Sequence, residues 1–264
     1  MSTLAFSDLD RTLIHSAAAS GLDAAGLARE AEAIEHLDGR VVSYLGRRAD
    51  AALRDLVAAR ALVPVTTRTV AQTLRVRGPF PAAELIVCAN GGRLLRHGVE
   101  DRGFGRAVDE ALAGAGAPLA EVEPLLRARP ESWRSADGLF AYAVRPDRDA
   151  AERARPAIEA LLRPLAWSAS VQGRKLYAVP DALSKRAAAV RLADELGAER
   201  SVAAGDSLLD ADLLRGADAA IRPAHGELHE TDLRLPHLTV TASSGLAAGT
   251  EIALWLRAQV LGAG

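Results

Sequence analysis

Four places in the sequence combine side chains that bind metal ions or phosphate groups, and each follows a short apolar run or begins a helical pattern. They hold Asp8, Asp10 and Thr12; Thr66, Thr67 and Arg68; Lys185; and Asp206 with Asp210. Carboxylate oxygens are the ligands that Mg²⁺ prefers, together with substrate phosphate. A hydroxyl and the compact ammonium of a lysine suit phosphate oxygens. These residue types therefore predict a site that holds a divalent cation beside a phosphate group.

The apolar runs alternate with helical patterns, as in a parallel α/β sheet. Near-continuous apolar runs, typical of strands buried on both faces, lie at residues 4–6, 62–65, 85–89, 201–204, 217–221 and 238–240. Helical patterns lie at residues 49–62, 184–196 and 245–261, with Ser184 as an N-cap and Gly197 as a stop. The alternation predicts a Rossmann-like, doubly wound parallel sheet. Ligands bind at the carboxyl edge of such a sheet, so the polar residues are expected to meet there.

Two segments interrupt this alternation. In residues 31–46, Asp38-Gly39 separates two short runs, which is a strong hairpin signal. In residues 99–180, Pro and Gly recur, and strand-like runs at 139–144, 167–171 and 175–179 accompany a helical pattern at 150–162. We expect residues 99–180 to form an inserted α/β domain, and residues 1–98 and 181–264 to fold together as the main domain.

Composition excludes several classes of protein. The 264 residues are 49% apolar and 25% charged, which is an ordinary globular balance, and the net charge of -2 argues against a nucleic-acid or anionic-membrane binder. The single cysteine, Cys88, excludes an intrachain disulfide and a cysteine-based zinc site. The N-terminus has no basic region of a signal peptide, and no long uncharged apolar stretch occurs. We therefore expect a cytoplasmic protein with neither a membrane nor a nucleic acid as partner.

The four places, in this order, resemble the motifs of the haloacid dehalogenase-like phosphatases. The matching segments are Phe6-Ser7-Asp8-Leu9-Asp10-Arg11-Thr12-Leu13 (DxDxT), Val65-Thr66-Thr67-Arg68, Lys185 in its helix start, and Gly205-Asp206-Ser207-Leu208-Leu209-Asp210 (GDxxxD). The insertion between the second and third motifs resembles the C2-type cap of the sucrose-phosphatase, mannosyl-phosphoglycerate phosphatase and Cof-like subclass, and so does Asn90-Gly91 after the third strand. Residues 8–14 are also similar to family members found beside tellurium-resistance genes.

The resemblance implies a reaction and a role for each motif residue. It implies a Mg²⁺-dependent phosphatase that hydrolyses a small phosphate monoester, with a sugar phosphate as the expected substrate. Asp8 would be the nucleophile that forms an aspartyl-phosphate, and Asp10 the general acid and base. The implied phosphate or substrate contacts are Thr66, Thr67, Arg68, Asn90 and Lys185. The implied metal site comprises Asp8, Asp10 through its backbone carbonyl, Asp206 and Asp210, which would orient metal-bound water or Lys185. The expected partner is a small phosphorylated metabolite, and no protein partner is readable.

Several alternatives stay open at this point. A phosphomutase of similar architecture and a non-catalytic protein that binds a phosphorylated ligand fit the same motifs. Arg11 stands where glycine is common in the subclass, and Arg11 and Arg68 suit ion pairs as well as site contacts. Asn90 suits a turn as well as a contact.

Arg174 and the lysine beside it, Lys175, suit either a solvated strand or a substrate contact. His225 and His229 have helical zinc spacing, but Gly226 weakens a helix there and the HExxH pattern is absent, so no zinc site is expected.

Overall fold

A computed structural model describes residues 2–262, and its centre is a sheet of five parallel strands. The strand order is β15 (Leu238–Val240), β14 (Ala219–Arg222), β13 (Arg200–Ala204), β1 (Thr3–Ser7) and β5 (Leu62–Pro64). Side chains alternate between two apolar layers, so Ala5 packs on one face of the sheet while Leu4 and Phe6 pack on the other. This double burial explains why the strands appear in the sequence as continuous apolar runs.

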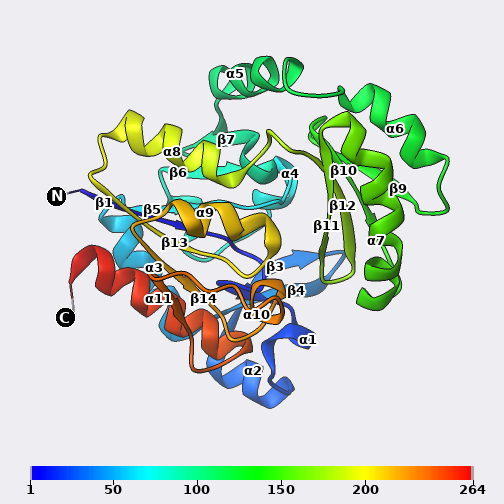
Figure 1. Cartoon of the computed structure of the whole chain (residues 1–264). Coiled ribbons are helices and arrows are strands. Elements are labelled where there is room, and N and C mark those ends of the chain that lie inside the picture. The colour runs from blue at the N-terminus through cyan, green and yellow to red at the C-terminus, as the bar shows by residue number, and fades with distance from the viewer. Residues whose placement is uncertain (1, 263–264) are drawn as a thin grey trace.

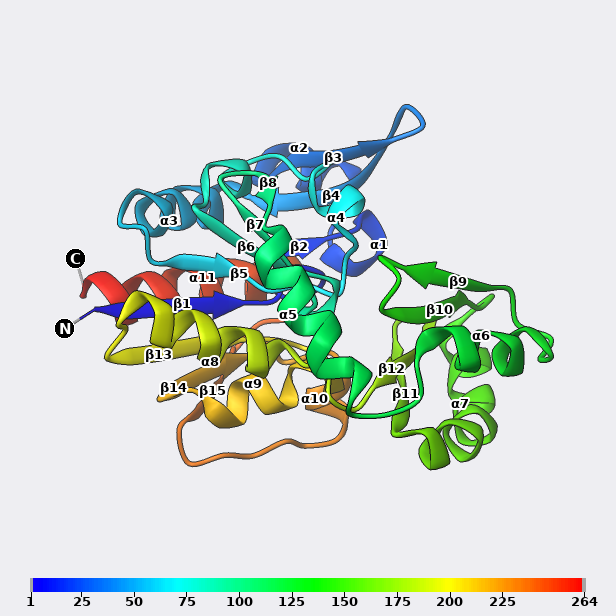
Figure 2. The ribbon, with the colours of Figure 1, turned by 90° about the horizontal axis from the view of Figure 1, so that it is seen from above.

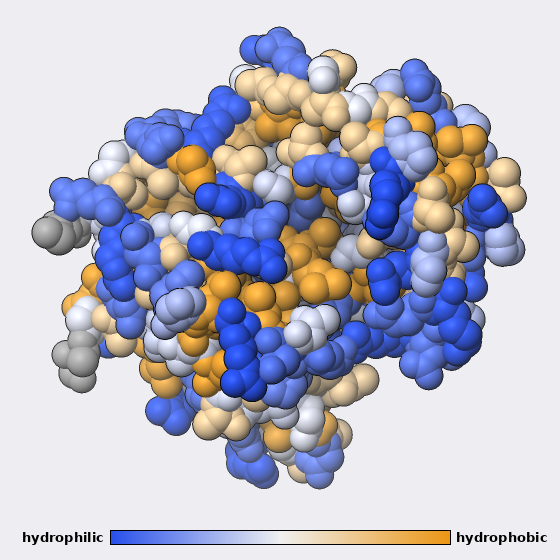
Figure 3. Space-filling view, viewed as in Figure 1, coloured by the Kyte–Doolittle hydropathy of each residue, from blue (hydrophilic) through white to orange (hydrophobic). Residues whose placement is uncertain are grey.

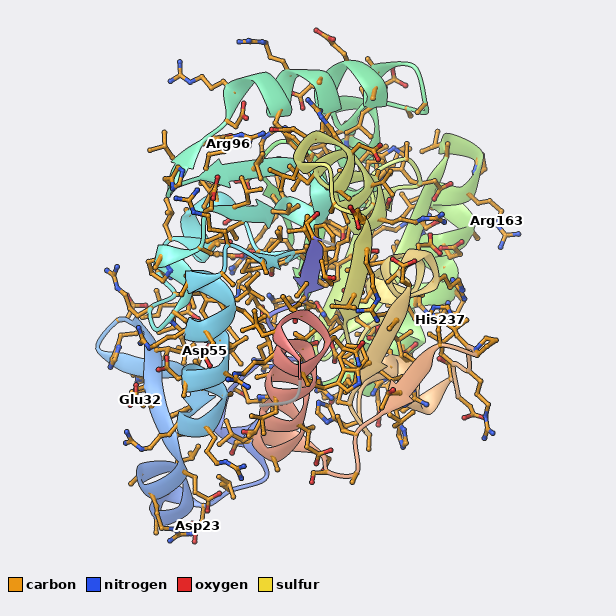
Figure 4. All side chains as sticks on the ribbon, turned by 90° about the vertical axis from the view of Figure 1, so that its left-hand side faces the viewer. Asp23, Glu32, Asp55, Arg96, Arg163 and His237 are labelled. Atoms are coloured by element: carbon orange, nitrogen blue, oxygen red, sulfur yellow. The ribbon has the colours of Figure 1, made fainter. Side chains whose placement is uncertain are left out.

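Helices cover both faces of the central sheet (Figure 1). On one face lie α3 (Arg47–Ala58) and α11 (Gly245–Leu261), and on the other α8 (Lys185–Leu196) and α9 (Ala211–Gly216). Asp55 of α3 faces α11, where its carboxylate accepts a hydrogen bond of 2.6 Å from Arg257 (Figure 4). The expected doubly wound parallel sheet is confirmed. None of the helices within residues 2–262 combines the length and apolar character needed to cross a bilayer.

A hairpin follows the first motif, as the sequence predicts. It pairs β3 (Ala31–Leu37) with β4 (Arg40–Gly46), and β4 also pairs with β2 (Ile14–His15). Asp38 and Gly39 both have positive φ (50° and 75°), as a two-residue primed turn requires. The short helices α1 (Ala17–Ser20) and α2 (Ala24–Glu30) precede the hairpin. An irregularity in the β3–β4 register around Glu35 leaves Ile34 and Glu35 both buried.

The strand expected at residues 85–89 forms, but it lies outside the five-stranded sheet. This strand, β6 (Leu85–Cys88), pairs antiparallel with β7 (Arg93–Arg96), which pairs with β8 (Val99–Glu100). A single parallel bridge between Val65 and Val87 connects it to the central sheet. The helix α5 (Arg102–Ala113) follows, and its Phe104 packs in the same apolar layer as α8. Residues 99–104, expected to belong to the insertion, therefore pack with the core, whereas Leu112 near the end of α5 packs against the apolar layer of the second sheet.

A second, antiparallel sheet of four strands stands beyond the carboxyl edge of the central sheet (Figure 2). Its order is β11 (Trp167–Gln172), β12 (Lys175–Pro180), β10 (Phe140–Val144) and β9 (Trp133–Ala136). The helices α6 (Leu119–Arg127) and α7 (Arg148–Leu162) cover its outer face and enclose Trp167. On the side shown in Figure 3, the surface is hollowed between this second sheet and the core.

Candidate active site

Asp8 lies at the carboxyl end of β1, where its backbone continues the pairing of β1 with β13. Its N–H donates to the carbonyl of Ala204 at 2.9 Å, so the sheet fixes the backbone position of this residue. The carboxylate is 1% exposed and accepts hydrogen bonds on both oxygens, at 2.6 Å from Lys185 Nζ and at 3.1 Å from the Thr12 hydroxyl. Burial raises the pKa of Asp8 to about 7, although the charge of Lys185 opposes the shift.

Lys185 is the first residue of α8, directly after the N-cap Ser184. Its ammonium is fully buried and donates to Asp8 and to Asp210, each at 2.6 Å. Burial would lower the pKa of Lys185, but the two carboxylates outweigh burial and raise it. Lys185 is therefore held as a cation between two acidic motifs that lie 202 positions apart in the sequence (Asp8 and Asp210).

The loop after β13 holds Asp206 and Asp210 close to Asp8. One oxygen of Asp210 accepts hydrogen bonds from the backbone N–H groups of Asp206 and Ser207 and from the Ser207 hydroxyl. Asp210 ends a short 3-10 helix, Leu208–Asp210. The loop packs so closely that a Cβ on Gly226 would lie 2.7 Å from an Asp206 carboxylate oxygen. These contacts position both carboxylates within the fold.

The three buried acids fit a divalent cation. One oxygen from each of Asp8, Asp206 and Asp210 lies within 4.8 Å of the others. Asp206 Oδ1 is buried without a hydrogen-bond partner, while Oδ2 accepts from Arg11 Nε at 3.2 Å. Burial, followed by the negative charges of Asp8 and Asp210, raises the pKa of Asp206 well above its usual value. An unpartnered carboxylate oxygen among hard oxygen donors is the chemistry that Mg²⁺ satisfies.

Asp10 is bound by Arg68 rather than by the acidic cluster. The guanidinium donates to both Asp10 oxygens, at 2.6 and 2.7 Å, and to Glu35 of the hairpin at 2.8 Å. Glu35 also accepts from Ser43 at 2.8 Å and pairs with Arg75 at 3.2 Å. Burial alone would raise the pKa of Asp10, but Arg68 outweighs burial and lowers it to about 2. Asp10 is thus ionised in this arrangement.

Asn90 connects the second motif to the turn before Lys185. Its N–H donates to the carbonyl of Thr66 at 2.9 Å, and its side-chain amide donates to the carbonyl of Leu183 at 3.0 Å. At the adjacent Gly91, with φ of +103°, a Cβ would lie 2.3 Å from the backbone carbonyl oxygen of Ser184. Asn90 and Gly91 therefore dock two loops of the site directly against each other.

Two threonines complete the second motif. Thr66 is fully buried, and its hydroxyl accepts from the backbone N–H of Arg68 at 3.2 Å. Thr67 extends toward the second sheet, where its hydroxyl lies 3.5 Å from Gln172 Oε1 of β11. Together with the residues above, they place every predicted site residue at the carboxyl edge of the central sheet.

The second sheet contacts the core at further points around this site. The backbone N–H of Val70 donates to Asp137, in the β9–β10 turn, at 2.8 Å. Arg148 at the start of α7 forms an ion pair with Glu230 of α10 (Glu227–Glu230). These contacts dock the second sheet on the core near the acidic cluster's own loops.

Sequence reasoning missed three residues next to the site: Glu35, Ser43 and Gln172. The hairpin that carries Glu35 and Ser43 is predictable from Asp38-Gly39, but nothing in its pattern indicates an acid directed inward. Gln172 follows the expected strand at 167–171, and its alternation with Ser168 and Ser170 is the available signal for a polar face. Neither His225 nor His229 belongs to the acidic cluster: His225 contacts the carbonyl of Arg11, and His229 contacts Arg222.

Comparison with solved structures identifies the fold. The sucrose-phosphatase from Synechocystis, solved with sucrose and phosphate, aligns with a TM-score of 0.62 at 14% identity, over 97% of this chain and 98% of that chain. The haloacid dehalogenase-like hydrolase yhjK from Bacillus subtilis aligns with a TM-score of 0.52 at 14% identity, over 100% of this chain and 96% of that chain. A trehalose-6-phosphate phosphatase related protein aligns with a TM-score of 0.54 at 16% identity, over 98% of both chains. This chain has the haloacid dehalogenase-like fold.

In this haloacid dehalogenase-like fold, the likeness spans both the parallel core and the second sheet, because nearly all of each chain aligns. The fold class expected from the sequence, with its inserted α/β part, is confirmed. No protein-family model matches the sequence, and no curated protein matches it. At these identities the comparisons establish the fold.

Proposed function

We propose that this protein is a Mg²⁺-dependent phosphatase that hydrolyses a small phosphate monoester through an aspartyl-phosphate on Asp8. One observation carries the proposal: three buried carboxylates lie within 4.8 Å of one another, with Lys185 bound between two of them and Asp206 Oδ1 unpartnered. A buried cluster with this excess of negative charge is costly unless a cation joins it. Asp8, Asp206 and Asp210 would hold Mg²⁺, which would neutralise the repulsion between carboxylate and phosphate.

The first step belongs to Asp8. A carboxylate oxygen of Asp8 attacks phosphorus while the ester P–O bond breaks, and Asp10 donates a proton to the departing oxygen. Lys185 compensates negative charge on the phosphate oxygens, and Thr66 offers its hydroxyl from the end of the second motif. In the second step Asp10 takes a proton from water, the water oxygen attacks phosphorus, and the bond from phosphorus to Asp8 breaks. Phosphate leaves and both carboxyl groups return to their starting states.

The ion pair between Arg68 and Asp10 sets a condition on this cycle. With a pKa of about 2, Asp10 in the arrangement seen here is ionised, so it holds no proton to donate and is a weak base. Donation to the leaving oxygen requires Asp10 to leave Arg68 and enter a site where its proton is retained. In this structure Arg68 binds Asp10. A contact between Arg68 and the phosphate of the substrate remains a prediction.

We further propose that residues 114–180 act as a cap that covers the carboxyl edge and excludes water during the reaction. We place the start of the cap after α5, at residue 114 and not at the expected residue 99, because β8 and Phe104 at the start of α5 pack with the core. The end of α5, at Leu112, lies against the cap. A cap that closes over the carboxyl edge would favour a small substrate. A sugar phosphate is the class we favour, since the sucrose-phosphatase shares the whole architecture.

The test is phosphate release from a panel of small phosphate esters, measured with Mg²⁺ and with EDTA. We expect turnover of at least one ester with Mg²⁺ and none with EDTA. An isomerised product formed only with a bisphosphate activator would identify a phosphomutase instead. If no ester turned over and a phosphorylated ligand still bound to the Asp8→Ala variant, we would conclude that the protein binds such a ligand without catalysing a reaction.

A further inference from the structure

The chain contains only two lysines, one in the core and one in the cap. Lys185 belongs to the core and binds Asp8 and Asp210. Lys175 belongs to the cap, at the start of β12, and the proposed mechanism gives it no role. Its position in the cap can be derived from the register of the strands.

The inner face of the β11–β12 pair carries Lys175 toward the core. Lys175 pairs with Gln172 and Tyr177 pairs with Ser170, and residues directly opposite in an antiparallel pair share a face. The alternate residues Leu176 and Ala178 pack in the apolar layer of the cap. Because Gln172 meets Thr67 of the second motif at 3.5 Å, the face that carries Lys175 is the one that covers the site.

This face holds a lysine without a carboxylate partner and two buried polar groups without a hydrogen bond. Lys175 Nζ lies 5.6 Å from the centre of the Tyr142 ring, and within residues 2–262 no carboxylate lies at ion-pairing distance from it. Gln172 Nε2 and Ser170 Oγ are buried without a hydrogen-bond partner. A partly buried ammonium and two buried polar groups together favour an anionic or strongly accepting ligand group.

The leaving group departs toward the cap, because in-line attack by Asp8, at the core, expels the ester oxygen on the opposite side of phosphorus, and Lys175 belongs to the cap face above Thr67. The pKa of Lys175 is raised, chiefly by the nearby Tyr177. Burial opposes this rise, and the negative charge of Asp10 adds to it. Lys175 in turn helps to lower the pKa of Asp10, whereas Asp8 takes its main compensation from Lys185. Because Lys175 lies on the cap face and the leaving group departs toward the cap, we infer that the ammonium faces the part of the substrate beyond the leaving oxygen.

We propose that Lys175 selects phosphate esters whose leaving group carries a second anionic group, a carboxylate or a second phosphate. The inference rests on the proposed phosphatase function and specifies its substrate class. The second anion would pair with the Lys175 ammonium and accept a hydrogen bond from Gln172 Nε2, while the scissile phosphate occupies the site of Asp8 and Lys185.

Pairs of esters that differ by one charged group test this assignment. Glycerate 3-phosphate is compared with glycerol 3-phosphate, and fructose 1,6-bisphosphate with fructose 1-phosphate, at equal ionic strength. We expect the wild-type kcat/KM to favour the anionic member of at least one pair by about tenfold or more. The carboxylate pair and the bisphosphate pair distinguish the two sources of the second anion.

Variants at Lys175 and at the adjacent Arg174 distinguish a specific role of Lys175 from a general effect of positive charge on substrate binding. Lys175→Gln should bring the preference ratio close to one, and Lys175→Arg should retain most of it. Arg174→Gln is the matched control, because Arg174 lies in the same turn with its side chain exposed, and its ratio should match the wild type. A wild type without any preference, or a Lys175→Gln variant that keeps it, would overturn the assignment.

The failure of this inference is distinguishable from failure of the proposed function. If no ester turned over in the wild type, the phosphatase proposal would fail. Calorimetric affinities of the same ester pairs, measured on Asp8→Asn and on Asp8→Asn with Lys175→Gln, would still decide whether Lys175 binds the second anion.

Discussion

Arg68 binds both carboxylate oxygens of Asp10, with Nε and Nη2 lying 2.6 and 2.7 Å from them. The same guanidinium reaches Glu35, which is 2% exposed, so one arginine connects the first motif, the second motif and the hairpin. Bidentate pairing of this kind fixes geometry as well as charge. The position of the proposed acid and base is therefore set in part by a residue of the hairpin that no motif contains.

Arg68→Met should destabilise the fold, because it leaves the buried Glu35 carboxylate with only Arg75 and Ser43. We expect a loss of about 3 kcal/mol in the free energy of unfolding, measured with urea. A double-mutant cycle with Glu35→Gln should show a coupling energy above about 1 kcal/mol. Arg102→Met, at an exposed position, is the control and should change stability little. Additive effects of Arg68→Met and Glu35→Gln would contradict the network.

Mg²⁺ should raise the melting temperature of the wild type, and Asp206→Asn should abolish most of that rise. Binding to the native state at a hundred times Kd contributes about 2.7 kcal/mol, which corresponds to a shift of several degrees. Thermal unfolding is followed at fixed ionic strength with Mg²⁺ or with NaCl. Asp38→Asn removes a carboxylate from the hairpin turn and should retain the full rise. An equal rise in Asp206→Asn would exclude that residue from the metal site.

Asp8→Asn should reduce phosphate release to background while the fold survives. The amide keeps an oxygen for Lys185 but is no longer a nucleophile, so the first step has no attacking group. Activity is measured on the ester found by the panel, and folding is checked by circular dichroism and thermal unfolding. Asp38→Asn again serves as the matched substitution and should keep wild-type kcat. Wild-type turnover in purified Asp8→Asn would refute the nucleophile assignment.

Glu227 should make stability fall as pH rises from about 4.5 to about 7. Burial raises the pKa of Glu227 to about 7, so the folded state holds a proton that the unfolded state releases at lower pH. Its ionisation then costs about 3 kcal/mol once the pH exceeds 7. Glu227→Gln should accordingly stabilise the protein at pH 8 and change it little near pH 4.5, as measured by urea unfolding.

The substitution Glu227→Gln preserves the main contact of this side chain. The backbone N–H of Leu208 donates to a carboxylate oxygen of Glu227 at 3.1 Å, and the oxygen of the replacing amide can accept the same hydrogen bond. Glu199→Gln, on the surface, is the control and should show no difference between the two pH values. If the free energy of unfolding of Glu227→Gln differed from that of the wild type by the same amount at both pH values, the Glu227 carboxyl would not cause the pH dependence of stability.

Gly91→Ala should be more destabilising than Gly98→Ala. Both glycines have positive φ, so both substitutions carry the backbone cost of about 1 kcal/mol for a side chain in that region. At Gly91 the new Cβ would also lie 2.3 Å from the Ser184 carbonyl, whereas nothing lies within 4 Å at Gly98. The difference in unfolding free energy measures how tightly Gly91 and the turn before Lys185 are docked, and equal costs would contradict this packing.

Much of the core could be predicted because its strands are buried on both faces. The runs around Leu4, Val63 and Val202 are apolar without alternation, and each ends where a site residue begins. The pattern predicts β6 as a strand too, but not its antiparallel partner β7. Leu94 and Leu95 lie between two arginines and leave too short a pattern to distinguish a strand from a loop.

The sequence by itself determined the order of the motifs, the two-residue turn at Asp38-Gly39 and the identity of the acids at the sheet edge. These features depend on local backbone geometry and on burial, and both can be predicted from the residue types along the chain. Only the tertiary structure decided that Glu35 binds Arg68, that Arg68 binds Asp10, and that the cap strand β11 meets the second motif at Thr67. Contacts between distant segments arise when several elements pack at once, and no spacing along the chain specifies which charges then meet.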